Sequence, residues 1–490
     1  MNVLFINPET KNYTRSVTTP LGLLSIASTL QAHGFSVRIY DRTVQKETLK
    51  DVLNTFKPQL VGVSLVSFKS FFDAIAVSEQ IKRLSLPVVW GGPLASELPE
   101  ATLKNACVDA VSIGEGEYTW LELAEAVRDG KTDFTGISGL ALRTADGGCV
   151  RTPERPFLDL GALPDLDWSL IPVEKYYQAN FGCKHMLYIY AAKGCPNSCA
   201  FCYNKDFHKC KYRKRPMESV LRDIRYLVEN HGADGFYFAD ELWCRNKREL
   251  RDVCDSLRSL NLDFRWGCQT RIGLFDEDDF RYMYNAGCRW VLFGVESGSK
   301  RILAAMNKRI AYDKIVQTVH DCRNAGIATV GSFMIGYPGE TPEDARETVA
   351  MIEKLDTNLI SVNFLIVLPN TDVYYQLIRE GRYQPITDLR AMAKEDPLRN
   401  LCYNYSSIPD LDMKVIRATY MWRSFEIGGK SIDGKRHTYA KKAIVDALHS
   451  LNYDSVGSFI WSAWQTGLEF LHYLFYAHAF PRIQKKYGIR

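Results

Sequence analysis

The sequence lacks any long apolar stretch. No run of about 18 or more apolar residues, the length that spans a bilayer, occurs in its 490 residues. The first ten residues, MNVLFINPET, also lack the basic segment that opens a secretory signal, and they have the character of a buried strand. We therefore expect a protein of the reducing cytoplasm, without an export signal or a membrane-spanning segment.

The sequence also lacks a large excess of charge of either sign. The 61 basic and 57 acidic residues leave a net charge of only +4, which gives no reason to expect nucleic acid as the main partner. Neither a repeat with a period of about 20–50 residues nor a low-complexity tract is present. What remains is the composition of an ordinary globular protein, long enough for about two to four domains.

Short apolar runs alternate with helical patterns over residues 1–130. The predicted strands are NVLFI, FSVRIYD, LVGVSLV, PVVWGG and residues 108–113, and the predicted helices cover 23–33, 51–56, 72–83 and 118–127. Repeated β-α units with apolar strands predict a doubly wound parallel sheet of the Rossmann or flavodoxin-like kind.

Three further regions follow. Residues 131–185 are rich in Gly, Pro and Asp and are predicted to be a linker with a small hairpin. Residues 186–385 carry six candidate strands separated by helices, which predicts a partial (β/α)6 barrel with its site at the carboxyl ends of the strands. Residues 386–490 are predicted to be helical and are rich in aromatics, among them Trp422, Trp461 and Trp464.

Three of the 13 cysteines crowd into one short segment, KGCPNSCAFC. Because Cys195, Cys199 and Cys202 follow the first predicted barrel strand, they lie in a loop at the active end, where three thiolates can reach three irons of one cube. The fourth iron would be left open for a ligand. A closed zinc site completed by His208 or Cys210, or simply buried free cysteines, are the alternatives.

The segment CPNSCAFC resembles the C-x3-C-x2-C loop of the radical S-adenosylmethionine superfamily, including the aromatic Phe201 before the last cysteine. The resemblance covers about residues 186–375. It implies a [4Fe–4S] cluster on the three cysteines, with the fourth iron chelated by S-adenosylmethionine. Reductive cleavage of that sulfonium would give methionine and a 5′-deoxyadenosyl radical.

The same resemblance implies contacts to S-adenosylmethionine. Asp240 and Glu241 end the second barrel strand, where the family accepts hydrogen bonds from the methionine amino group; a solvated acidic turn is the alternative. Arg271 follows the third strand and could pair with the methionine carboxylate, or be a surface arginine.

Two later strands complete this predicted site. Glu296, in FGVESGS, could accept bonds from the ribose hydroxyls, and Ser297 with Gly298 lets the backbone approach closely. Gly336, in GSFMIGYPGE, matches the family's glycine-rich segment near the adenine.

Small residues stand at the carboxyl ends of the predicted strands of the first sheet, where they open a crevice for a large planar ligand or its tail. The order NP, TPLGLLSIASTL, VGVS, GGP and GEGE resembles the cobalamin-binding domain that precedes radical S-adenosylmethionine domains, over about residues 1–130. The resemblance implies cobalamin contacts from Ser64, Val66, Gly91, Gly92, Pro93, Gly114, Glu115 and Gly116.

One departure stands out. Better-known cobalamin domains carry a histidine cobalt ligand after the first strand, whereas the loop here reads NPETKNYTRS. His33 precedes a predicted C-cap glycine and is expected only to cap its helix. We therefore predict base-off, histidine-off cobalamin; a domain that has lost cobalamin is the alternative.

Together, the two modules predict a C-methyltransferase that uses two molecules of S-adenosylmethionine and acts on an unactivated carbon of a small or lipid-like substrate. Oxidative cyclases, such as magnesium-protoporphyrin ester cyclase, and ring-rearranging enzymes share this fusion, and a cofactor-binding sensor is the non-enzymatic alternative. A flavodoxin, ferredoxin or reductase is the expected electron donor. The tail KKYGIR leaves membrane association open, and no residue can be assigned to hydrogen donation.

Overall fold

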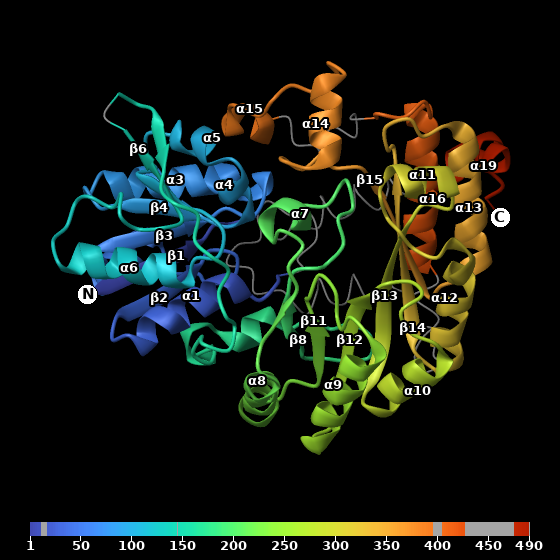
Figure 1. Cartoon of the computed structure of the whole chain (residues 1–490), viewed down its shortest axis with the longest axis horizontal. Coiled ribbons are helices and arrows are strands. Elements are labelled where there is room, and N and C mark those ends of the chain that lie inside the picture. The colour runs from blue at the N-terminus through green and yellow to red at the C-terminus, as the bar shows by residue number, and fades with distance from the viewer. Residues whose placement is uncertain (11–16, 145, 395–403, 427–474, 490) are drawn as a thin grey trace.

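The computed structural model describes residues 1–10, 17–144, 146–394, 404–426 and 475–489. Two β-sheets with their helices stand side by side, the first in blue and the second in green to yellow in Figure 1. The chain is thus an α/β protein, as the alternation of apolar runs and helical patterns predicts.

The first sheet has the strand order β2-β1-β3-β4-β5-β6-β7, and β1 to β5 are parallel. Val3 and Phe5 of β1 pack in the core with α1 and α6, whereas Leu4 and Ile6 pack in the core with α2 and α3. Helices therefore cover both faces, and the predicted doubly wound sheet is confirmed. The elements are β1 (Asn2–Asn7), α1 (Leu21–Ala32), β2 (Ser36–Asp41), α2 (Leu49–Phe56), β3 (Leu60–Ser64), α3 (Phe71–Lys82), β4 (Val88–Gly91), α4 (Pro93–Glu97), α5 (Pro99–Leu103), β5 (Ala110–Ser112) and α6 (Glu117–Arg128).

The hairpin predicted within 131–185 is part of this sheet. Strand β6 (Leu140–Arg143) pairs antiparallel with β5, and β7 (Cys149–Arg151) pairs antiparallel with β6. Beyond the hairpin, the side chains of Trp168 and Tyr176 tie the segment to the two halves of the molecule. The Trp168 indole donates to Asp223 of the barrel (2.9 Å), and the Tyr176 hydroxyl donates to Asp41 of the first sheet (2.9 Å).

The second sheet has six parallel strands in the order β15-β14-β13-β12-β11-β8. The predicted six-stranded partial barrel is therefore confirmed. The elements of this region are β8 (Met186–Ile189), β9 (Ala192–Lys193), α7 (Asn204–Phe207), β10 (Arg213–Lys214), α8 (Met217–His231), β11 (Gly235–Phe238), α9 (Lys247–Ser259), β12 (Arg265–Thr270), α10 (Glu277–Asn285), β13 (Cys288–Glu296), α11 (Lys300–Ala305), α12 (Ile315–Asn324), β14 (Ala328–Ile335), α13 (Pro342–Leu355) and β15 (Leu359–Phe364). Outside the six-stranded sheet, β9 and β10 pair antiparallel with each other; this pair, whose connection is residues 194–212, is here called the β9–β10 hairpin.

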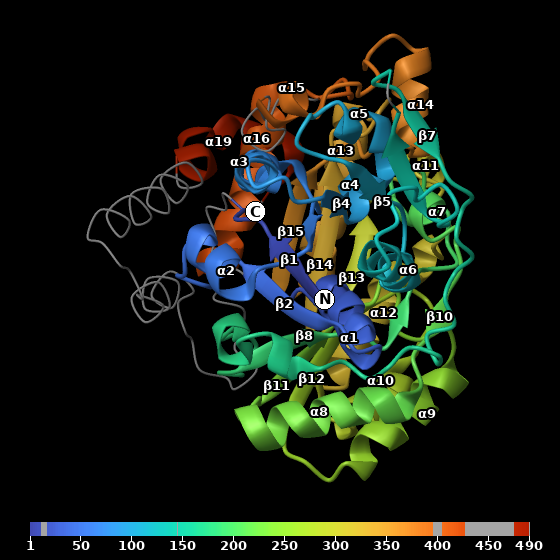
Figure 2. The same ribbon diagram turned by 90° about the vertical axis from the view of Figure 1, so that its left-hand side faces the viewer.

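The last region covers edges of both sheets. Helix α14 (Asp372–Arg379) leads to α15 (Leu389–Lys394) beside the first sheet, and α16 (Asp410–Glu426) lies along β15 with α19 (Pro481–Tyr487) packed on it (Figures 1 and 2). Ser424 accepts from the Ile360 amide (3.1 Å) and so joins α16 to the edge strand. Trp422 is buried, while Trp461 and Trp464 lie outside the described residues. Among the described helices, none is both long and apolar enough to cross a bilayer.

One hydrophobic core joins the two halves. It contains Leu65 and Trp90 of the first sheet together with Tyr337 and Leu365 from the carboxyl ends of β14 and β15. The carboxyl ends of strands from both sheets therefore meet at a shared boundary, where the predicted cofactor residues of both lie.

Candidate active site between two sheets

The cysteines lie in the loop 194–203, here called the cysteine loop, between β9 and α7. Its conformation is fixed by the buried Asn204, whose side chain accepts from the Cys195 amide (2.8 Å) and donates to the Cys195 carbonyl (2.6 Å). The Ala200 amide donates to the Met306 carbonyl (2.9 Å), which ties the loop to the segment after α11. The loop is thus ordered by the protein itself.

The three thiols belong to one electrostatic neighbourhood. Burial raises the pKa of Cys202 to about 11, and Cys199 and Cys195 add to that rise, while the Asn204 amide and Lys308 oppose it. None of the three forms a disulfide. Three thiols on an ordered loop are a donor set that fits a [4Fe–4S] cluster with one iron left open.

The residues required by a zinc interpretation are differently engaged. His208 directs Nε2 at Glu241 (3.3 Å to Oε1), and Cys210 directs its thiol at the Asn197 carbonyl (3.5 Å). Within the described ranges, no three His, Cys, Asp or Glu side chains converge on a point as a single zinc ion requires. A cube asks for a different arrangement, because each cysteine binds its own iron.

Asp240 and Glu241 are neighbours with opposite electrostatics, and neither is a solvated turn residue. Asp240 accepts from the Ala191 amide (2.9 Å), and burial raises its pKa to about 8. Glu241 accepts from the Gly194 amide (2.8 Å) and the Tyr203 hydroxyl (2.7 Å); although burial raises its pKa, His208 and Tyr203 outweigh this effect and lower it to about 2. Adjacent carboxyls with pKa values pushed apart are typical of functional sites.

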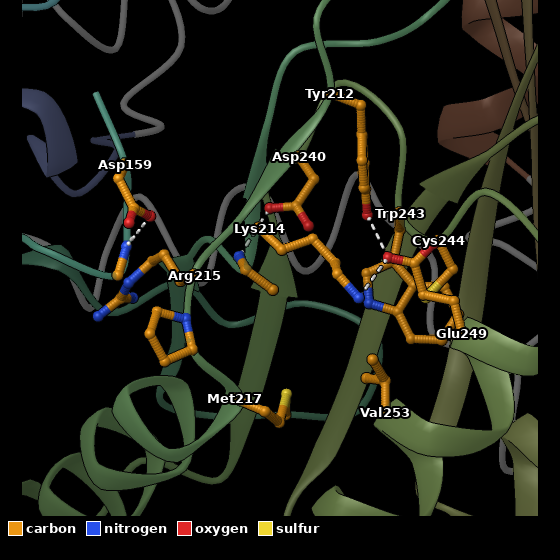
Figure 3. Close-up of a pocket in the computed structure, with 13 residues that line it drawn as sticks. Asp159, Tyr212, Lys214, Arg215, Met217, Asp240, Trp243, Cys244, Glu249 and Val253 are labelled. Carbon is orange, nitrogen blue, oxygen red and sulfur yellow. Dashed lines mark hydrogen bonds and ion pairs between the residues drawn. The ribbon is translucent and has the colours of Figure 1, made fainter. Parts of the chain in front are cut away.

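The two carboxyls also point to different places. Asp240 lines a cavity of about 390 Å³ together with Tyr212, Lys214 and Glu249 at the start of α9 (Figure 3). Glu241 instead holds the start of the cysteine loop. The sequence analysis assigned both carboxyls to one ligand contact. It considered His208 only as a zinc ligand and missed Tyr203, and it did not predict that both contact Glu241.

Arg271 is neither free on the surface nor directed at an open space. Its guanidinium donates to the carbonyls of Lys308 and Arg309, to the latter at 2.7 Å. The ammonium of Lys308 in turn pairs with Glu296 (2.9 Å) and lies 6.0 Å from the centre of the Phe201 ring. Lys308 therefore joins two predicted site residues, and the sequence motifs did not reveal it.

Glu296 has an unusual backbone conformation. Its φ is +69°, a region that residues other than glycine rarely adopt and that is common at functional sites. Ser297 is buried and bonds Thr348 of α13 (3.1 Å). A Cβ on Gly298 would lie 2.3 Å from the Glu347 carbonyl oxygen, so this glycine is required by α13 and not by a ligand.

Glu340 fixes the backbone of the Gly336 segment by accepting hydrogen bonds from it. The buried carboxyl of Glu340 accepts from the amides of Gly336 (2.7 Å) and Tyr337 (3.1 Å). Burial raises the pKa of Glu340 to about 7. Gly336 has φ +92° and lies against Met413 of α16, so the described C-terminal region contacts this end of the barrel.

The predicted cobalamin residues form a different surface. Val66 is 59% exposed just after β3. A Cβ on Gly92, where φ is +96°, would lie 2.9 Å from the Leu65 carbonyl, so the fold itself needs this glycine. Gly91, beside it, has no such constraint, because its nearest neighbour would be Ser112 at an ordinary 3.7 Å. Ser64 ends β3 next to Gly91, and Pro93 begins α4.

His33 caps its helix as expected. Its Nδ1 lies 2.8 Å from the Thr29 carbonyl at the end of α1. Because α1 runs back across the parallel sheet, this end is at the amino edge of the strands, away from Ser64 and Gly91. The prediction of histidine-off cobalamin stays a prediction.

The GEGE loop (residues 114–117) faces the barrel. Glu115 forms a two-pronged ion pair with Arg213 (2.6 and 2.8 Å), and Glu117 pairs with Lys193 (3.0 Å). Beside it, a cavity of about 300 Å³ is lined by residues of both halves, including Gly114 and Glu97 on one side and Asp206 on the other. The predicted cobalamin residues Gly114 and Glu115 and the segment after the cysteine loop therefore lie across one boundary.

Comparison with known proteins agrees with this arrangement. The family model described as the radical SAM superfamily matches residues 189–352, and the one described as the B12 binding domain matches residues 12–124. A Pyrococcus horikoshii protein named as an uncharacterized methyltransferase is 30% identical over 388 residues, which are 76% of this chain and 82% of that protein. The chain belongs to the cobalamin-binding radical S-adenosylmethionine family.

A further relative and a solved structure of similar fold extend the comparison. Anaerobic magnesium-protoporphyrin IX monomethyl ester cyclase of Rubrivivax gelatinosus is 27% identical, over 77% of this chain and 70% of the cyclase. The structure of the radical S-adenosylmethionine methyltransferase TsrM from Kitasatospora setae, with cobalamin and a [4Fe–4S] cluster, has a TM-score of 0.65 at 24% identity, covering 77% of this chain and 78% of TsrM. As a member of the cobalamin-binding radical S-adenosylmethionine family, the chain is an enzyme whose cofactors are the cluster, S-adenosylmethionine and cobalamin.

Proposed function

We propose that this enzyme methylates an unactivated carbon of a small-molecule substrate, using two molecules of S-adenosylmethionine. The observation that carries the proposal is the closeness of the two predicted cofactor sites: the GEGE loop contacts the β9–β10 hairpin, whose strand β9 leads directly into the cysteine loop. The relationship to proteins named as methyltransferases supports it further.

Residues of the barrel would hold the cluster and its ligand. Cys195, Cys199 and Cys202 would bind three irons, and Glu241 keeps the start of their loop in place. When bound, these cofactors supply a radical able to remove hydrogen from carbon, and a methyl group to take its place. The chain itself contributes binding, orientation and the exclusion of water.

Lys308 is the best candidate to bind the methionine carboxylate of S-adenosylmethionine. Its ammonium lies beside Glu296, near the ring of Phe201, and it lowers the pKa of the Cys202 thiol against the effect of burial. Arg271, assigned to the carboxylate from sequence, would instead hold the backbone of residues 308 and 309 in position. We propose that Lys308 binds the carboxylate and that Arg271 positions it.

An oxidative cyclase is the second candidate, because a magnesium-protoporphyrin ester cyclase is among the relatives. In either case a low-potential electron donor, such as a flavodoxin or ferredoxin, would be the protein partner of the cluster, and we place the enzyme in the reducing cytoplasm that such a cluster needs.

One experiment separates the two without knowledge of the substrate. Anaerobic protein with cluster and hydroxocobalamin is reduced and given S-adenosylmethionine with a deuterated methyl group. A methyltransferase should form deuterated methylcobalamin and S-adenosylhomocysteine, and slowly 5′-deoxyadenosine. A cyclase should release 5′-deoxyadenosine without labelled methylcobalamin. That result, or the absence of all these products, would overturn the proposal.

A further inference from the structure

Four charged residues join the two halves of the molecule. Glu115 and Glu117 of the GEGE loop are 7% and 2% exposed, and Lys193 and Arg213 of the β9–β10 hairpin are 20% and 16% exposed. The Lys193 ammonium lies 3.0 Å from Glu117 and 3.7 Å from Glu115. We call these four residues the interdomain ion-pair network.

Further contacts hold the carboxylates and the basic side chains of the network in place. Glu117 also accepts from the hydroxyl of Ser25 in α1 (2.7 Å), which fixes its carboxylate against the first sheet. Arg213 lies over the ring of Phe157 (4.5 Å) and donates to the Leu158 carbonyl (3.3 Å). A bidentate, largely buried arginine–carboxylate pair has a defined direction, unlike a solvated surface pair.

The barrel side of the network leads directly to the cysteines. Lys193 is paired with Arg213 in the hairpin and stands two residues before Cys195. Gly194, between them, donates to Glu241, and a Cβ there would lie 2.1 Å from the Lys211 carbonyl oxygen, so the two backbone segments are in close contact here. We therefore expect a displacement of Lys193 to displace the cysteine loop as well.

The other side leads to the predicted cobalamin crevice. Gly114 and Gly116 flank Glu115, and the Gly114 amide donates to Ser96 of α4 (3.0 Å), which follows the Gly91 turn. From these contacts we propose that Lys193 and Arg213 are positioning residues that set the distance and orientation between the cobalamin crevice and the cysteine loop. The inference rests on the proposed pair of cofactors, but not on the identity of the reaction.

The test compares Arg213→Met and Lys193→Met with Arg213→Lys and with Lys205→Met. Lys205 follows the cysteine loop as well, but its partner is Asp372 of α14 and not a residue of the first sheet, so it serves as the matched control. In protein with both cofactors, the reduced cluster should shorten the spin relaxation of cob(II)alamin. We expect at least a threefold weaker enhancement in the two methionine variants, partial recovery in Arg213→Lys, and no change in Lys205→Met.

A second measurement does not need cofactors. Hydrogen exchange of residues 110–118 and 186–196 should become at least tenfold faster in Arg213→Met, with the remaining sheets protected as before. Glu115→Gln added to Arg213→Met should change little more, because the pair is already broken. Unchanged relaxation and unchanged local exchange would overturn the inference. Failure to bind cobalamin would count against the proposed function, while the exchange data would still decide the role of the network.

Discussion

The two sheets hold their predicted cofactor residues in opposite ways. In the barrel, the side chains of Asp240, Glu241 and Glu296 are already engaged with the protein, through amides, a hydroxyl and a lysine. In the first sheet, four of the eight corresponding positions are glycines and Val66 is exposed, although Glu115 is paired with Arg213 of the barrel. A reactive ligand needs an orientation fixed in advance, whereas a large tail needs an open groove.

This difference predicts how substitutions should impair the cofactor site of each half. Substitutions in the barrel should act by releasing an ordered loop or by leaving a charge without its partner. Substitutions in the first sheet should act by filling space. The predictions below test this contrast, starting from the largest expected effect.

Loss of the cysteines should abolish the barrel site. Anaerobically reconstituted protein should hold about four irons per chain, and Cys195→Ala, Cys199→Ala and Cys202→Ala combined should hold close to none. Cys210→Ala is the matched control, because Cys210 lies beside the loop but bonds the Asn197 carbonyl. Iron analysis and absorption spectra measure the result; a cluster kept in the triple variant, or lost in Cys210→Ala, would contradict the ligand assignment.

A bulky side chain in the predicted cobalamin crevice of the first sheet should strongly weaken cobalamin binding. Gly91→Leu should weaken hydroxocobalamin binding by at least about a hundredfold, or about 2.7 kcal/mol, because the side chain would occupy the space intended for the tail. Gly91 is a sharper choice than Gly92, whose replacement would also disturb Leu65. Gly136→Leu, in open space on the surface, is the control. Equal binding by both variants would move the cobalamin site elsewhere.

The fold was predictable because the spacing of apolar residues along the chain indicates which segments are strands and which are helices. Apolar strands alternating with helices gave both sheets, and the glycine at position 34 gave the end of α1. The hairpin at 140–151 was recognised, but not its pairing with β5, because a strand at an antiparallel edge carries no sign of its neighbour.

The site was predictable only where a motif names its residue. The cysteines and Glu296 come from motifs, whereas Lys308, His208 and Arg213 act through partners 12 to 98 positions away in sequence. Such pairs exist only after folding, and a lysine in a sequence looks the same whether it is solvated or buried against a carboxylate.

The buried Glu340 carboxyl should make the stability of the barrel depend on pH. The glycines of the first sheet have no ionisable side chain and should have no such effect. Glu340 binds its proton more tightly in the folded chain, where its pKa is about 7, than in the unfolded chain, where it is near 4.5. Stability should therefore fall, by an amount on the order of a few kcal/mol, as pH rises between these values. The Tm difference between Glu340→Gln and the wild type should thus increase from pH 5 to pH 8, measured by thermal denaturation.

The control for this titration is Glu343→Gln. Glu343 lies three residues further along, exposed and paired with Arg346. Its replacement should leave the pH dependence of Tm as in the wild type. A difference between Glu340→Gln and the wild type that stays constant over the whole range would show that the Glu340 carboxyl does not titrate there.

The smallest expected effect concerns the cation beside Glu296. Lys308→Met should weaken S-adenosylmethionine binding about tenfold, or about 1.4 kcal/mol, because the methionine carboxylate would lose a partly buried partner. The loss is limited, since chelation by the open iron would persist. Arg271→Met should have a weaker effect of the same sign, because it loosens only the backbone that carries Lys308. Lys300→Met, which removes an exposed lysine paired with Asp313, is the control. Calorimetry on anaerobic protein distinguishes the assignments: a larger loss in Arg271→Met than in Lys308→Met would return the carboxylate contact to the arginine, and with it the assignment that the sequence motif favoured.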